Sequence, residues 1–290
     1  MIVKEDVEIV KGIFLREFTT FRIGGEASCF FIVNSIDGLR KLIRDNLVKE
    51  KGFYFLGGGS NLLVSDALID KPIVTLGEEF SFIERLDECI VCVGAKTSLP
   101  KLIAYAVSCN LKGLEELSGI PATVGGMAVM NASSFGKSFC SLIEEATVVT
   151  KDGEVKVIKN SDIESAYRYS SLRDRIVIEV KLKLEKGRDV KDRVGFYLRK
   201  RMASQDFSFP SAGCIFKNPS GVSAARLIDA CSLKGFMIGD AQVSLRHANF
   251  IINRGRARTK DVLYLIELVK ERVYEKFGVE LEEEVIRWEC

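Results

Sequence analysis

Histidine is nearly absent from this chain, whose 290 residues contain only His247. A zinc hydrolase that holds its metal through two histidines is therefore excluded. A serine hydrolase would have to use His247 as its base, and no Gly-x-Ser-x-Gly segment supplies a nucleophile for it. We interpret His247 as a structural residue, and we predict no metal site.

Long apolar runs and an excess of charge of one sign are also missing. The chain has 42 basic and 40 acidic residues, and no stretch approaches the ~20 apolar residues of a membrane span. The first residues mix charges with apolar side chains, whereas a signal peptide needs an apolar core. We therefore expect a cytoplasmic protein that binds neither nucleic acid nor membrane, and the sequence indicates no obligate protein partner.

Close cysteine pairs are scarce, although the chain has eight cysteines. Only Cys89 and Cys92 lie near each other, in an apolar run whose alternation as a strand points their thiols to opposite faces. Without a second pair, a zinc clip is not expected. The cysteines are typical of small buried apolar residues in an intracellular protein.

Two nucleotide-binding motifs are incomplete. Gly136-Lys137-Ser138 has the end of a P-loop, but Asn131 stands where that pattern needs its first glycine. Gly57-Gly58-Gly59 has the start of a dinucleotide fingerprint, but Leu62 stands at its third glycine position. A phosphate-transfer ATPase is therefore not predicted, and the fold need not be a Rossmann fold.

Two glycine-dense loops, Leu56–Leu63 and Gly119–Gly126, are present and contain no lysine or arginine. Consecutive glycines remove every Cβ from a strand exit and expose successive backbone N–H groups, which can cradle a diphosphate without a cationic side chain. Either loop alone is compatible with an ordinary tight turn. Together, the two loops favour a bound nucleotide cofactor.

Local patterns predict the first part of the chain as α/β followed by antiparallel sheet. Residues 27–56 predict strand, helix and strand, with Ser35 as the helix cap and a helix over Leu39–Val48. The first glycine loop then follows the carboxyl end of a strand. Asp152-Gly153 joins two alternating runs, which is typical of a hairpin turn.

The last part of the chain has a different character. Residues 185–204 are charged and helical, and we interpret them as a solvated connecting helix. A nucleic-acid-binding arm is the weaker alternative, since few aromatic residues are interleaved with the charges. Residues 205–290 predict a separate α+β domain with a long amphipathic helix near Thr259–Phe277.

Seven segments, in the same order along nearly the whole chain, resemble one family. Each segment alone is weak, whereas the ordered set is specific. The segments are Thr19–Ala27, Leu56–Leu63, Gly119–Ala132, Tyr167–Ser170, Pro210–Pro219, His247–Phe250 and Leu281–Val285. This set resembles the UDP-N-acetylenolpyruvoylglucosamine reductases, also called UDP-N-acetylmuramate dehydrogenases, and the compact length resembles their shorter subtype.

This resemblance implies an α+β protein with an FAD-binding fold of the vanillyl-alcohol-oxidase type in two subdomains, followed by an α+β substrate-binding domain. The three domains are expected at residues 1–72, 73–186 and 187–290. NADPH would be the electron donor, and a UDP-sugar, UDP-N-acetylglucosamine enolpyruvate, would be reduced to UDP-N-acetylmuramate for peptidoglycan. Flavin relatives often attach FAD to an N-terminal histidine, and none precedes His247, so we expect non-covalent FAD.

Three residues resemble the family's active positions. Hydride added to the β-carbon of an enolpyruvyl group pushes charge onto the carboxylate, and the α-carbon then needs a proton. Arg168 would bind the carboxylate and stabilise that charge. Glu284 would be a polarising partner that is protonated when it acts, and Cys214 would deliver the proton.

The ligand contacts follow from the same resemblance. Lys217 and Asn218 would meet phosphate or sugar oxygens of the substrate, and Arg246 is a weaker candidate for the diphosphate. The expected FAD-binding residues are Gly57, Gly58, Gly59, Ser60, Asn61, Gly119, Ile120, Gly125, Gly126 and Asn131.

Cys214 departs from the family's pattern, because most members have serine at this position. A thiol that titrates near ~8.5 is a better acid than an alcohol, but it is useless as an acid once ionised. The alternatives are a buried structural cysteine, or a flavin-binding protein whose chemistry is lost or redirected, such as a sensor or an oxidase on another acid. Retention of Arg168, Glu284, Lys217 and Asn218 favours the working reductase.

Overall fold

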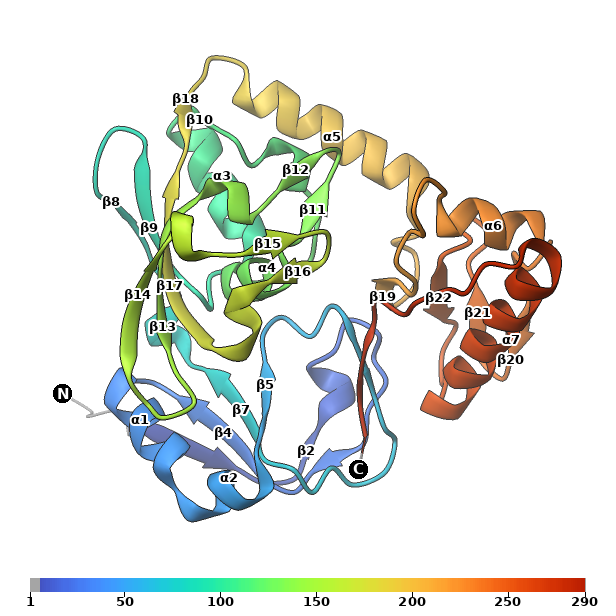
Figure 1. The fold of residues 1–290 in the computed structure, drawn as a ribbon, viewed down its shortest axis with the longest axis horizontal. Coiled ribbons are helices and arrows are strands. Elements are labelled where there is room, and N and C mark those ends of the chain that lie inside the picture. Colours follow the sequence, from blue (N-terminus) through green and yellow to red (C-terminus); the bar gives the residue numbers. More distant parts are fainter. Residues whose placement is uncertain (1–5, 290) are drawn as a thin grey trace. The chain divides into compact units, whose positions relative to one another are not determined.

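A computed structural model describes residues 6–289 (Figure 1). These residues form two compact units. The first unit contains residues 6–11, 29–58 and 71–200, and the second contains residues 12–28, 59–70 and 201–289. Each unit has its own apolar core. The units are built from interleaved segments and do not coincide with the three contiguous domains predicted from the sequence, whose boundaries stay a prediction.

The first unit contains a mostly parallel four-stranded sheet in the order β1-β4-β7-β5, with β1 antiparallel at the edge. Its strands are β1 (Val7–Val10), β4 (Phe30–Val33), β7 (Ile73–Leu76) and β5 (Tyr54–Leu56), and its helices are α1 (Ile36–Arg44) and α2 (Asn46–Lys51). Ser35 caps α1 as predicted, accepting a hydrogen bond from the Gly38 N–H at 2.9 Å. The predicted helix through Val48 is instead two helices, because Asp45 accepts from the Leu47 N–H and starts α2.

An antiparallel five-stranded sheet, in the order β14-β13-β17-β9-β8, completes the first unit. The predicted hairpin at Asp152-Gly153 is confirmed, and Gly153 has a left-handed φ of 77°. The strands are β14 (Val155–Lys159), β13 (Ile143–Val149), β17 (Ile176–Lys183), β9 (Ile90–Gly94) and β8 (Ile83–Arg85), and the helices are α3 (Leu99–Ser108) and α4 (Val124–Met130). Short pairs add β10 (Leu111–Lys112) with β18 (Glu185–Lys186), β11 (Ser133–Ser134) with β12 (Lys137–Ser138), and β15 (Ser165–Ala166) with β16 (Tyr169–Ser170).

In the second unit one helix packs against an antiparallel sheet in the order β19-β22-β21-β20, and a second helix packs against the first. The sheet contains β19 (Ser211–Cys214), β22 (Phe250–Asn253), β21 (Ala241–Val243) and β20 (Met237–Ile238), and the helices are α6 (Ala224–Ala230) and α7 (Thr259–Phe277). The early segments of this unit contribute β2 (Ile13–Phe14) paired with β3 (Glu26–Ala27), and β6 (Leu62–Val64) paired in parallel with β23 (Ile286–Trp288). The predicted helix at Thr259–Phe277 is confirmed.

Helix α5 (Val190–Ser204) carries the chain from the first unit into the second. It is not simply solvated, because Arg193 forms ion pairs with Glu115 at 3.4 Å and with Glu116 at 3.0 Å, and the Glu115 side chain is only 2% exposed. Among residues 6–289, no helix is long and apolar enough to cross a membrane.

Candidate functional site

The two glycine loops meet in the first unit. Gly57 and Gly58 leave β5 and lie against Thr123, at the start of α4. A Cβ on Gly57 would lie 3.2 Å from the Thr123 Oγ1, and a Cβ on Gly58 would lie 3.2 Å from the Thr123 backbone nitrogen. Neither glycine has a left-handed φ, so the need for glycine here is a need for space.

The backbone amides of Gly125 and Gly126, at the start of α4, already donate hydrogen bonds within the protein. Thr123 accepts a hydrogen bond from the Gly126 N–H at 3.4 Å, and the Gly125 N–H donates to the Ala95 carbonyl at 2.9 Å. A Cβ on Gly125 would also lie 2.9 Å from the Ala95 Cβ, so this glycine lets the helix approach β9. The geometry therefore gives Gly125 and Gly126 a packing role, while their contact with FAD stays a prediction.

The amides of the first loop differ from those of α4. Within residues 6–289, no hydrogen bond uses the backbone N–H of Gly58, Gly59 or Ser60. Gly59 has a left-handed φ of 63°, and a Cβ there would lie 1.9 Å from the Phe18 carbonyl oxygen. Adjacent backbone amides that donate no hydrogen bond within residues 6–289 fit a diphosphate ligand, so the residues present fit a bound dinucleotide.

The other predicted cofactor residues of the first unit hold the second loop in shape. Gly119 has a left-handed φ of 84°, and the partly buried Ile120 packs on the core. Asn131 ends α4 in a left-handed conformation. Its amide nitrogen donates to the Ala166 carbonyl at 2.9 Å and its amide oxygen accepts from the Cys140 N–H at 3.1 Å. Both polar atoms of the Asn131 side chain are thus engaged inside the unit.

Arg168 lies at the turn between β15 and β16, with a left-handed φ of 57°. Left-handed backbone is uncommon for a residue other than glycine, and such residues cluster at functional sites. The Arg168 Nη1 donates to the Ser133 carbonyl at 3.2 Å and to the Ser133 hydroxyl at 3.1 Å, and its guanidinium lies 5.2 Å from the Tyr167 ring centroid. These contacts orient the guanidinium within the first unit.

Cys214 ends β19 in the second unit and is half-buried. Between Ser211 and Cys214 the register with β22 shifts, and Gly213 has a left-handed φ of 78°. Such bulges re-aim side chains and are frequent beside active sites. The sequence alone did not predict this bulge. Its one signal there is Gly213, which directly precedes the cysteine.

The chain after Cys214 runs beside the acidic segment that carries Glu284. The Lys217 N–H donates to the Glu282 carbonyl at 2.8 Å, and the Glu284 N–H donates to the Ile215 carbonyl at 2.7 Å. The Lys217 ammonium also pairs with the Glu282 carboxylate. The second unit therefore brings Cys214, Lys217 and Glu284 onto two adjacent extended segments.

Asn61 joins this group in a way that the sequence did not suggest. Its amide nitrogen donates to the Glu284 carbonyl at 2.9 Å, and its own carbonyl accepts from the Ile286 N–H at 3.0 Å. The first glycine loop is therefore tied to the segment of Glu284 through Asn61. A direct contact of Asn61 with FAD stays a prediction.

The remaining candidates of the second unit have internal partners. Asn218 accepts from the Ala224 N–H at 3.0 Å and helps to start α6. Arg246 is exposed, and its guanidinium donates to the Met202 carbonyl at 3.0 Å. His247 packs against Phe250 with ring centroids 4.5 Å apart and the two rings tilted by 53°. Burial, with the nearby positive charge of Lys234, lowers the pKa of His247 and favours its neutral form.

Comparisons with known proteins cover nearly the whole chain. Residues 27–159 match an FAD binding domain, and residues 205–288 match the UDP-N-acetylenolpyruvoylglucosamine reductase C-terminal domain. The chain is 37% identical over 284 residues to the UDP-N-acetylenolpyruvoylglucosamine reductase of Clostridium novyi, covering 96% of this chain and 91% of that protein. The chain belongs to the UDP-N-acetylenolpyruvoylglucosamine reductase family.

Further relatives agree with membership of this reductase family. The Heliobacterium modesticaldum reductase is 39% identical over 274 residues, covering 92% of this chain and 86% of that protein. The crystal structure of the reductase from Thermus caldophilus matches with a TM-score of 0.83 and 38% identity, covering 98% of this chain and 99% of that chain. The predicted family and α+β fold are thus confirmed, and the chain is an FAD-containing oxidoreductase.

Proposed function

We propose that this reductase uses NADPH to reduce UDP-N-acetylglucosamine enolpyruvate to UDP-N-acetylmuramate, a cytoplasmic step in making peptidoglycan precursors. The observation that carries this proposal is the pairing of residues 215–217 with residues 282–284, which supports a shared role for Cys214, Lys217 and Glu284. Bound FAD would accept electrons from NADPH and supply hydride to the β-carbon of the enolpyruvyl group. Every other task falls to side chains and backbone amides of this chain.

Arg168 stabilises the negative charge that develops on the substrate carboxylate. As hydride reaches the β-carbon, electrons move toward the carboxylate and give it enediolate character. A guanidinium can hold both carboxylate oxygens through parallel N–H donors, and it stays positively charged throughout. The hydrogen bonds that the Arg168 Nη1 donates to the Ser133 carbonyl and hydroxyl orient the guanidinium before substrate arrives, which supports this assignment.

Cys214 then protonates the α-carbon, and Glu284 polarises the enolpyruvyl group. The S–H bond of Cys214 breaks, a C–H bond forms, and the thiolate recovers its proton from solvent. The bulge at Gly213 supports this role because it sets the direction of the Cys214 side chain independently of the strand register. Glu284 acts in its protonated form as a hydrogen-bond donor.

The nucleotide portion of the substrate is held by Lys217, Asn218 and Arg246. Their positive charge and amide groups suit the diphosphate and sugar oxygens. FAD would be held non-covalently through the glycine loops, by the residues predicted from the sequence. The amides of Gly58, Gly59 and Ser60, which donate no hydrogen bond to the described residues 6–289, support a diphosphate contact in the first loop.

Anaerobic half-reactions test this function. NADPH should bleach the yellow enzyme, and addition of the enolpyruvyl sugar should restore the colour and yield UDP-N-acetylmuramate. The serine usually found in the family is replaced by Cys214, so redirected flavin chemistry is the second candidate. Bleaching by NADPH without recolouring by the enolpyruvyl sugar would favour that candidate and refute the proposed reaction.

A further inference from the structure

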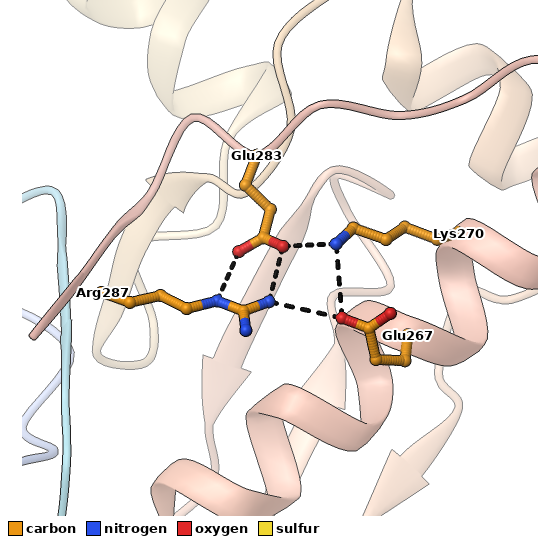
Figure 2. Close-up of polar contacts among 4 residues, drawn as sticks. All are labelled: Glu267, Lys270, Glu283 and Arg287. Carbon is orange, nitrogen blue, oxygen red and sulfur yellow. Dashed lines mark hydrogen bonds and ion pairs between the residues drawn. The ribbon is translucent and has the colours of Figure 1, made fainter. Parts of the chain in front are cut away.

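Consecutive carboxylates at Glu282, Glu283 and Glu284 have different surroundings. Glu282 is paired with Lys217 at the segment's exposed side. Glu283 is only 17% exposed and faces α7, where it meets Lys270 and the Arg287 of β23 (Figure 2). Successive side chains of an extended segment point to opposite sides, so Glu283 and Glu284 face different environments.

Glu283 is held by a dense set of ionic contacts. The Arg287 Nε and Nη2 donate to its two oxygens at 2.6 and 2.5 Å, which is a bidentate pair. The Lys270 ammonium donates to the Glu283 Oε1 at 2.5 Å. Glu267 lies beside both cations, 3.3 Å from Lys270 and 3.4 Å from Arg287, as Figure 2 shows. We call the side chains of Glu283, Lys270 and Arg287 the clamp.

The charges of the clamp balance when Glu267 is included. Burial by itself raises the pKa of Glu283, but the hydrogen bonds from Arg287 and Lys270 outweigh burial and lower that pKa. Glu283 is therefore a carboxylate whose charge is neutralised locally. Without these cations, the half-buried Glu283 carboxylate would lie one residue from Glu284 with its negative charge uncompensated.

The backbone of residues 283–284 is also held by hydrogen bonds on the side away from the clamp. The Glu284 N–H donates to Ile215 at 2.7 Å, the Glu284 carbonyl accepts from Asn61 at 2.9 Å, and Glu283 pairs with Phe216. Backbone contacts thus hold the segment against the chain of Cys214, while the clamp holds it against α7. Together they leave little freedom for the peptide that carries the Glu284 side chain.

We propose that the clamp is a positioning device that fixes Glu284 for the reaction. This inference rests on the proposed function, in which Glu284 meets the enolpyruvyl group. Arg287 and Lys270 do not act on substrate, and their effect passes through Glu283 and its backbone. A misplacement of about 1 Å in a reacting group can slow a reaction by about 10²-fold, so loss of the clamp should slow chemistry while leaving ligand binding intact.

The test compares Glu283→Gln and Arg287→Gln with the wild-type holoenzyme. The rate of flavin recolouring at saturating enolpyruvyl sugar should fall about 10- to 100-fold, while half-saturation by the sugar and bleaching by NADPH stay within about twofold. The double variant should be no slower than Glu283→Gln alone, because that single change already removes the ion pairs of Glu283 with both Arg287 and Lys270. Amide hydrogen exchange in residues 281–286 should become about tenfold faster or more.

Glu275→Gln is the matched control, because it removes an exposed ion pair with Arg272 from the same helix. It should change neither the recolouring rate nor exchange in residues 281–286. Clamp variants with wild-type recolouring, or with equal slowing of both half-reactions, would overturn the positioning role. Wild-type enzyme that the enolpyruvyl sugar does not recolour would instead refute the proposed function, whatever the exchange data show.

Discussion

Gly58 provides a direct test of the cofactor loop. In Gly58→Ala the new Cβ would lie 3.2 Å from the Thr123 nitrogen and 3.4 and 3.5 Å from the Ala122 Cα and carbonyl carbon. The neighbours are backbone atoms, so the two loops must separate by a few tenths of an ångström. Such overpacking costs about 1–3 kcal/mol, offset by about 0.4–1 kcal/mol because alanine restricts the unfolded chain.

The expected net loss is therefore about 0–2.6 kcal/mol, which at an unfolding entropy of about 0.6 kcal/mol/K for 290 residues is up to about 4 °C in the melting temperature of the flavin-free protein. Because the change moves the amides of the loop, the Kd for FAD should rise about tenfold or more, equivalent to about 1.4 kcal/mol. Gly58→Val should purify without flavin.

Titration of the flavin-free protein with FAD, followed by flavin fluorescence, gives the Kd, and thermal unfolding gives the stability. The matched control is Gly195→Ala in α5, where the Cβ would meet only the end of the Arg199 side chain at 3.3 Å. It should leave the Kd unchanged and stabilise the helix by about 0.5–1 kcal/mol. If Gly58→Ala lowers the melting temperature and binds FAD with the wild-type Kd, the loop is only a turn and the reasoning is refuted.

Four further results are expected. Arg168→Ala should leave bleaching by NADPH intact but slow recolouring by substrate about 10²-fold or more, and equal slowing of both steps would place Arg168 in the scaffold. Cys214→Ala should recolour slowly and Cys214→Ser should stay active, while only the cysteine enzyme should lose activity at alkaline pH as its thiol ionises; matching alkaline limbs would remove Cys214 from the mechanism. Glu282→Gln frees the Lys217 ammonium, so the KM for the UDP-sugar should fall up to about fivefold with kcat unchanged, and a higher KM would contradict this. Acid precipitation should release all FAD into solution, and flavin that stays with the denatured chain would disprove non-covalent binding.

Local signals in the sequence predicted the local structure well. Ser35 begins a helix, Asp152-Gly153 forms a hairpin, and Thr259–Phe277 is helical, because each depends on residues within a few positions of one another. The two glycine loops were also visible, since three adjacent glycines in Gly57–Gly59 are unusual in any context. The contact of Gly57 and Gly58 with Thr123 in the second loop was not predicted and comes from the structure.

Long-range hydrogen bonding could not be read from the sequence. Gly125 resembles a phosphate-binding glycine, but its N–H donates to the Ala95 carbonyl. Because Gly125 has no side chain, the helix can pack closely against Ala95. Asn131 resembles a cofactor residue, but its side chain joins two loops. Arg287 and Glu283, which form the bidentate pair, are only four residues apart in sequence. Their pair is half-buried because this segment runs beside α7, and the sequence does not show that path.

The pairing of β6 with β23 has a consequence for the order of events during synthesis. Asn61 and Glu284, which are bonded to each other, are 223 residues apart in the chain. At about 5–20 residues per second, a ribosome takes roughly 10–45 s to make the intervening chain. Throughout that interval β6 lacks its partner strand and exposes unpaired backbone, so the second unit can close only after translation has reached its last residues. A chain truncated before residue 286 would therefore leave β6 without its native partner strand.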